Sequence, residues 1–204
     1  ASTNLITYSE DFTNGFWTKS NFIVTSNETI SPKGDLTADK ITNSALSSEM
    51  FATSSALTTA TFSIFVKKGN QRYFGLTING TNDFNSRYQG IFDLDNGVLF
   101  AQNNSSVSLN NVSSNIKSFG NGWYRCEITA TFAISANGFV VIQHSNNVPV
   151  TISENLSWNN SSSGNSFIWG AQFEAGSYAT SYIPTLGSIG TRDYDTMPTY
   201  LDLT

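Results

Sequence analysis

Short apolar runs separated by clusters of Asn, Gly and Ser recur along the chain, and this pattern constrains the fold more than any other feature. Runs of this kind, bounded by turn-forming residues, are typical of β-strands in a sandwich or a barrel. The Asn-Gly pair at 96–97 predicts a hairpin turn, because both residues tolerate a positive φ. We expect strands at 5–9, 22–25, 39–42, 49–53, 61–67, 73–79, 88–94, 98–101, 116–119, 123–132, 139–144 and 167–173.

Composition supports the same fold class. Asn, Ser and Thr make up more than a third of the 204 residues, and these residues disfavour helices, because Ser and Asn compete with helical hydrogen bonds and Thr suits a pleated surface. The hydrophobic fraction of 39% is sufficient for a core. The sequence therefore predicts a single all-β domain, an antiparallel β-sandwich.

Charge and cysteine content exclude several classes of protein. The net charge is −5 and Lys and Arg are scattered, so we expect no nucleic-acid partner. No apolar run approaches the length of a membrane span, and the first residues lack the pattern of a signal peptide. The single cysteine, Cys126, excludes an internal disulfide framework and zinc-finger spacings.

Alternation within the expected strands assigns their faces. In 123–132 the residues of one parity, from Tyr124 to Phe132, are apolar and predict the core side, whereas Trp123, Arg125 and Glu127 share the other side. In 73–79 the core parity begins at Phe74, which leaves polar residues and Tyr73 outward. An outward face that mixes polar and aromatic side chains suggests a ligand-binding sheet, and the alternative is an ordinary solvated one.

Catalytic motifs are scarce. His144 is the only histidine, so a Ser-His-Asp or Cys-His arrangement would depend on it, and Cys126 points to the core by parity. Metal clusters of histidine and cysteine are excluded by count. No pair of carboxylates is marked by its spacing, so the sequence predicts that the chain is not an enzyme. A glycan-degrading enzyme stays an alternative if two carboxylates converge in a cleft.

Calcium takes oxygen ligands from carboxylates, amides and carbonyls. The acidic turn with Glu10 and Asp11 follows the first expected strand, and Gln172 lies on the last one. If these two strands pair, their oxygens converge, and a structural Ca²⁺ is one reading of this arrangement.

Sugar binding fits the outward residues best. Saccharide rings stack on exposed aromatics, and their hydroxyls bond to amide, carboxylate and guanidinium groups. Packing against the domain is the alternative role for each aromatic side chain. The expected ligand-binding residues are Tyr73, Arg87, Gln89, Trp123, Arg125, Gln143 and Trp158.

Six segments in this order resemble a module of phage tail and tail-fibre proteins, itself similar to jelly-roll carbohydrate-binding modules of the concanavalin-like or galactose-binding kind. The match covers roughly residues 4 to 194, and Trp123, Tyr124, Arg125, Trp169, Gly170 and Gln172 occupy its signature positions. The segments are NLITYSEDFTNGFWTK, DLTADKI, FSIFVKKG, FDLDNGVL, GNGWYRCEIT and FIWGAQFEAGSYATSYIPT.

The resemblance implies a jelly-roll β-sandwich at 1–190 and a C-terminal strap or linker at 191–204. It also implies a location in the virion or on an extracellular surface, contacts with other tail proteins, presentation as a homotrimer in the full fibre, and attachment to host glycans without catalysis. A structural spacer module of the virion, which makes only protein–protein contacts, is the alternative function.

Overall fold

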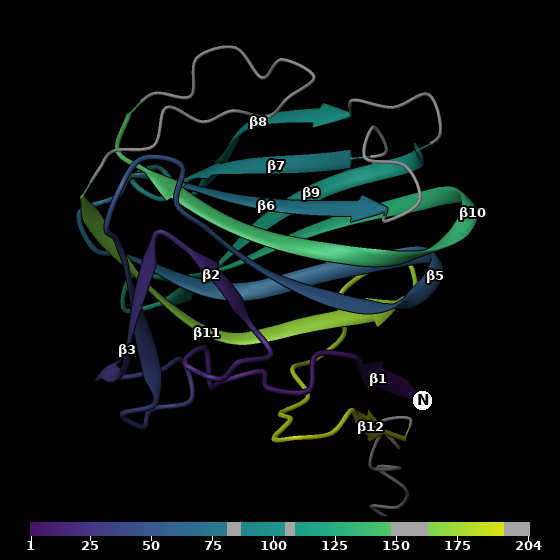
Figure 1. The fold of residues 1–204 in the computed structure, drawn as a ribbon, viewed down its shortest axis with the longest axis horizontal. Helices are drawn as coiled ribbons and strands as arrows, with labels where there is room; N and C mark the ends of the chain where they lie inside the picture. Colours follow the sequence, from purple (N-terminus) through teal and green to yellow (C-terminus); the bar gives the residue numbers. More distant parts are fainter. Residues whose placement is uncertain (81–86, 105–108, 148–162, 194–204) are drawn as a thin grey trace, which may run out of the picture.

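The computed structural model describes residues 1–80, 87–104, 109–147 and 163–193. This part of the chain is built from β-strands and turns (Figure 1), and it has no helix that could span a membrane. The strands are β1 (Ser2–Asn4), β2 (Thr18–Ser20), β3 (Phe22–Thr29), β4 (Ala38–Asn43), β5 (Glu49–Lys68), β6 (Tyr73–Gly80), β7 (Arg87–Asp93), β8 (Val98–Asn104), β9 (Leu109–Gly120), β10 (Trp123–Ser145), β11 (Gly164–Ala175) and β12 (Gly190–Arg192).

Two long strands, β5 and β10, pair with each other antiparallel and run through both layers of a sandwich. The first sheet has the order β3, β4, β11, residues 60–68 of β5, residues 123–131 of β10, and β9. The second sheet has the order β2, the first half of β5, the second half of β10, β6, β7 and β8.

Strands from the early part of the chain pair with strands from its late part, and the strands in the middle of the chain pair with each other. β4 pairs with β11, each half of β5 pairs with the opposite half of β10, and β6 pairs with β7. Pairing of early strands with late ones in two packed sheets is the wrap of a jelly roll. The predicted all-β antiparallel sandwich in a single domain is therefore confirmed, whereas the predicted boundary near residue 190 stays a prediction.

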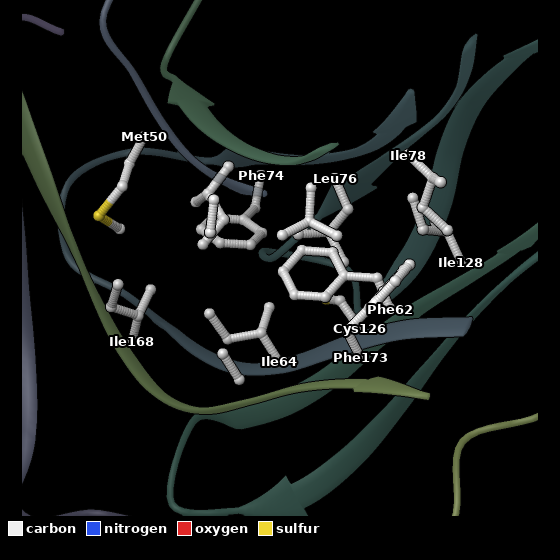
Figure 2. Close-up of a cluster of buried hydrophobic side chains, with 14 of the residues drawn as sticks. Met50, Phe62, Ile64, Phe74, Leu76, Ile78, Cys126, Ile128, Ile168 and Phe173 are labelled. Carbon is white, nitrogen blue, oxygen red and sulfur yellow. The ribbon is translucent and has the colours of Figure 1, made fainter. Parts of the chain in front are cut away.

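The core lies between the two sheets. Phe62 and Ile64 of the first sheet face Phe74 and Leu76 of the second (Figure 2), and all four are fully buried. Cys126 is buried among them, as the alternation of 123–132 predicts. Full burial of one such large side chain contributes about 1.5–3 kcal/mol, so this alternating pattern is what holds the layers together.

A bulge in β11 moves Trp169 out of the core, in which strict alternation running back from the buried Phe173 would place it. The register against β5 shifts between Trp169 and Gln172, and Gly170 has a φ of +62°. Ile168 therefore enters the core, and Trp169 packs with Phe65 on the outer side of the first sheet.

Residues 177–187 form a strap that crosses the outer side of the first sheet. Tyr182 packs on Trp169, with ring centroids 4.6 Å apart. The strap is hydrogen-bonded to β11, because the Ile183 N–H donates to Gln172 Oε1 at 2.7 Å and the Thr180 N–H donates to the buried Glu174 at 3.0 Å. The strap or linker predicted at 191–204 lies mostly outside the described residues and stays a prediction.

Both ends of the described chain lie on one side of the sandwich. β1 pairs antiparallel with β12 in a separate two-stranded sheet, and the label N stands beside it (Figure 1). The predicted strand at 5–9 is absent from this structure; the segment instead bonds to β11 at separate points, such as Leu5 N–H to Phe173 O.

His144 joins the two sheets and is fully buried. Its Nε2 donates to Asn43 Oδ1 at 2.6 Å, because an amide oxygen only accepts, and its Nδ1 lies 2.9 Å from Ser166 Oγ. Burial lowers the pKa of His144 to about 3. This histidine is therefore neutral and structural, and it is sealed from solvent.

Gly170→Ala should destabilise the domain. An added Cβ would lie 3.1 Å from Phe65 and 3.2 Å from Tyr182, at a φ that L side chains rarely adopt. We expect the free energy of unfolding in urea to fall by about 1–3 kcal/mol. Gly15→Ala is the matched control, since nothing lies within 4 Å of its Cβ position. Equal stability of the two variants would contradict the role assigned to the bulge.

His144→Asn should flatten the dependence of stability on pH. Below pH 6.5 the unfolded chain protonates this histidine whereas the folded chain does not, so the free energy of unfolding falls on acidification by up to about 1.4 kcal/mol per pH unit. Asp39 acts in the opposite direction, because burial raises its pKa to about 6. Urea titrations at pH 7, 6 and 5 measure the slope, and parallel slopes of wild type and variant would show that His144 does not titrate as described.

Candidate functional site

The outer side of the second sheet carries a set of polar side chains that we call the polar face: Thr77 and Asn79 of β6, Arg87 and Gln89 of β7, and Gln143 of β10. Thr77 lies opposite Gln89 and Asn79 opposite Arg87, while Gln143 lies opposite Gly75. The structure thus brings together three of the residues predicted from sequence to bind a ligand, namely Arg87, Gln89 and Gln143.

Gln89 is the centre of the polar face. Its Nε2 donates to Thr77 Oγ1 at 3.1 Å and to Gln143 Oε1 at 3.2 Å, and its side chain is fully buried. The bond to Gln143 crosses β6 beside Gly75, which has no side chain to obstruct it. The sheet register therefore fixes the orientation of this amide.

Two amide oxygens of the polar face are buried and have no hydrogen-bond partner in the described part of the chain: Gln89 Oε1 and Asn79 Oδ1. They belong to diagonal neighbours on adjacent strands. A buried polar atom without a partner costs about 1–3 kcal/mol, and native proteins satisfy such atoms with water or a ligand. The polar face is therefore suited to a ligand that donates hydrogen bonds.

One opposite charge pair frames the polar face. Burial raises the pKa of Glu49 on β5 above its usual value, and attraction to the guanidinium of Arg87 offsets only part of this rise. Both side chains are partly exposed. The face thus holds buried amide oxygens beside a partly exposed carboxylate and guanidinium, which is a set that recognises hydroxyl groups.

Aromatic pairs lie at the two ends of this side of the second sheet. Phe51 of β5 and Phe139 of β10 have ring centroids 6.1 Å apart, and Tyr73 of β6 and Phe100 of β8 have centroids 4.8 Å apart. Tyr73 points outward as predicted, but it is only 2% exposed, whereas Phe100 is 40% exposed. The accessible ring at this end is therefore Phe100 and not Tyr73.

Phe100 was not among the residues predicted to bind a ligand. It stands in the run VLFAQ, where an almost unbroken apolar series conceals the alternation. Phe51 and Phe139, which lie outward between buried neighbours, were not among the predicted residues either. Their parity was the available signal, since Met50, Ala52 and Val140 are the core residues beside them.

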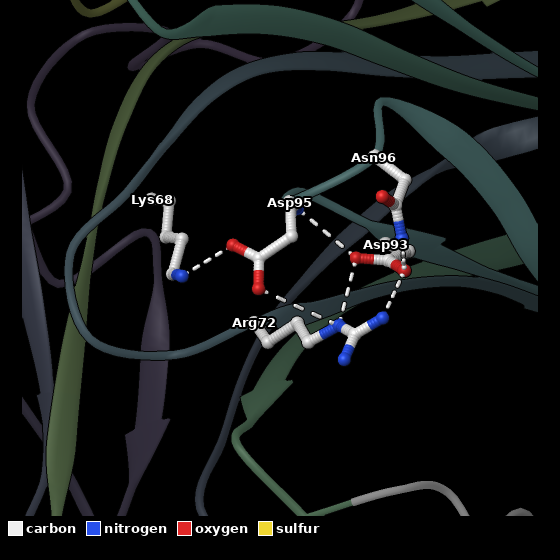
Figure 3. A network of polar contacts seen from close by, with 5 residues as sticks. All are labelled: Lys68, Arg72, Asp93, Asp95 and Asn96. Carbon is white, nitrogen blue, oxygen red and sulfur yellow. Dashed lines mark hydrogen bonds and ion pairs between the residues drawn. The ribbon is translucent and has the colours of Figure 1, made fainter.

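A charged network fixes the end of the face near Tyr73 (Figure 3). Arg72 donates to both oxygens of Asp93, at 3.0 and 2.7 Å, and its guanidinium lies over the Tyr73 ring. Hydrogen bonding by Arg72, with further bonds from Asn96 and the Asp95 N–H, lowers the pKa of Asp93 to about 2. Asp93 therefore stays ionised and holds Arg72 in place at neutral pH.

Trp123 and Arg125 lie on the first sheet, away from the polar face on which we expected them. The cause is the course of β10, whose residues 123–131 belong to the first sheet and whose residues 136–145 belong to the second. Trp123 is buried and donates to Ile30 O at 3.0 Å. Arg125 donates to Ser63 Oγ at 2.9 Å and lies over Phe65. Trp158 lies outside the described residues.

The residues predicted to hold calcium serve other contacts. Gln172 Oε1 accepts the strap hydrogen bond from Ile183, and Glu10 accepts one from Tyr182 at 2.9 Å. Glu10 and Asp11 line a pocket of about 400 Å³ together with Asp39. In the described ranges no three acidic, histidine or cysteine side chains are placed to hold a metal. The calcium ion stays a prediction.

The chain matches no family profile and no curated protein. Among solved structures it is similar to the enzymatically active domain of tailspike protein 4 from bacteriophage CBA120, with 13% sequence identity and a TM-score of 0.45. The match covers 83% of this chain and 21% of that one, so the chain spans about a fifth of that protein's length.

The description of this neighbour as enzymatically active contradicts the sequence-based prediction that the chain is not an enzyme. That prediction is withdrawn.

Proposed function

We propose that the chain is a glycan-binding domain of a phage tail or receptor-binding protein and that the polar face is its binding site. The observation that carries this proposal is the pair of buried, unpartnered amide oxygens, Gln89 Oε1 and Asn79 Oδ1, between two aromatic pairs. A sugar ring meets both needs, because its hydroxyls donate to the amides while its apolar face packs on a ring.

Two further features support attachment to a host surface. The ordered sequence segments resemble those of tail modules, and the paired β1 and β12 let the sandwich project from one point of a longer chain. A single sugar site binds one glycan weakly. Presentation in several copies, such as a trimer, raises the avidity by about 10²–10⁴ without new contacts.

A spacer module that makes only protein–protein contacts is the second candidate. Tyr178, Leu186 and Ile189 follow β11 in the chain and are 70%, 82% and 55% exposed. Exposed apolar side chains of this kind are suited to contact with a neighbouring domain. This role involves the strap and leaves the polar face without a partner.

Gln89→Ala and Asn79→Ala should each weaken glycan binding by about fivefold to tenfold, because each removes one hydrogen bond to the ligand. Binding is measured by glycan array and calorimetry on a multimerised domain, with O-antigen, capsular polysaccharide, dextran, galactan and alginate as probes. Asn115→Ala is the matched control, since Asn115 is an exposed amide on β9 of the first sheet and contacts Glu127.

The same experiment separates the candidates. Binding that is equally strong in all variants would contradict the polar face as the site. A folded domain that binds none of the five probes would favour the spacer. Loss of binding with a chelator would support the calcium ion, and release of reducing sugar would show that the domain also cleaves its ligand.

A further inference from the structure

Phe100 stands at a bulge in the edge strand β8. The register against β7 shifts between Ile91 and Phe92, so that Ala101 and Leu99 pair while Phe100 is the additional residue. Bulges redirect a side chain, and here the ring of Phe100 lies over Tyr73 and remains 40% exposed. A large apolar ring is thereby presented on the same side of the sheet as Gln89, three residues along β8 from Asn103, the partner of Gln89.

The ring of Phe100 rests on a fixed support. Tyr73 also contacts the guanidinium of Arg72, which lies 5.1 Å from the ring centroid. Arg72 is held in turn by two hydrogen bonds to Asp93, and the same carboxylate accepts bonds from Asn96 and from the Asp95 N–H (Figure 3). The rigid charged network therefore positions an exposed aromatic ring through Tyr73.

A second aromatic pair, Phe51 and Phe139, lies at the opposite end of the polar face. The strands run in the order β5, β10, β6, β7, β8, so four strand spacings separate Phe51 from Phe100. At about 4.8 Å per spacing this is roughly 19 Å measured across the strands. The unpartnered oxygens of Gln89 and Asn79 belong to β7 and β6, between the two pairs.

We infer that the two aromatic pairs are the end subsites of one elongated site, so that the domain binds an internal stretch of several sugar units lying across the strands. Phe100 is the specificity-determining residue at the β8 end. This inference rests on the proposed glycan-binding function. A single sugar bonded to the central amides meets Phe139, which lies directly opposite Asn79. It does not reach Phe100, which lies three residues along β8 from Asn103, the partner of Gln89, or about 10 Å away.

Phe100→Ala should abolish the advantage of long ligands. The probes are oligosaccharides of graded length, prepared by mild acid hydrolysis of whichever of the five polysaccharides the domain retains, and the affinity is measured by calorimetry. In the wild type we expect the affinity to rise with length and to level off once the chain spans both pairs. In the variant the longest probes should bind about tenfold more weakly, whereas the shortest are unchanged.

Phe119→Ala is the matched control. Phe119 is 45% exposed, packs edge-to-face on Phe65 and contacts a cation, Lys117, but it lies on the first sheet. Its removal should leave the length dependence intact. Phe100→Tyr keeps the ring and should retain wild-type affinity for long probes, which separates loss of the ring from misfolding; thermal melting confirms that each variant is folded.

The outcomes distinguish this inference from the proposed function. If short probes bind as tightly as long ones, or if Phe100→Ala and Phe119→Ala behave alike, the elongated site is wrong while glycan binding stands. If none of the five polysaccharides binds, the proposed function and this inference fall together.

Discussion

The antiparallel pairing of β5 with β10 is the interaction on which the rest of the structure depends. Because both strands bend and continue from one sheet into the other, a single ladder joins the layers and sets their register. β11 and β9 extend the ladder in the first sheet, and β2 and β6 extend it in the second. Core residues such as Phe62 and Leu76 then face each other because the ladder has fixed the parity of every neighbouring strand.

The two outer sides of the sandwich differ in what they do. On the first sheet, Trp123, Phe65 and Trp169 form an aromatic cluster, and each indole N–H is bonded to the loop that follows β3, at Ile30 O and Thr37 Oγ1. The strap and the loop between β3 and β4 cover this side of the sandwich. The segments that carry the resemblance to tail modules therefore stabilise the fold. On this side of the sandwich their aromatic rings pack against other side chains.

On the outer side of the second sheet, two amide oxygens are held in place without a hydrogen-bond partner among the described residues. The amide of Gln89 is oriented by Thr77 and Gln143, yet its oxygen and that of Asn79 lack partners. Such an arrangement costs stability, and it is compensated when a ligand or water supplies the missing donors. The charged network around Asp93 adds rigidity at one end, so the face is organised before anything binds to it.

Alternation and composition by themselves determined that the chain is an all-β sandwich and which parity of 73–79 and 123–132 is buried, because the two-residue period of a strand is a local property. They also marked Arg87, Gln89 and Gln143 as outward. Only the tertiary structure decided that Arg125 and Gln143, on the same strand, belong to opposite sheets, that the bulge at Gly170 moves Trp169 out of the core, and that Phe100 covers Tyr73. Bends and bulges arise from contacts between distant strands, and no local pattern encodes them.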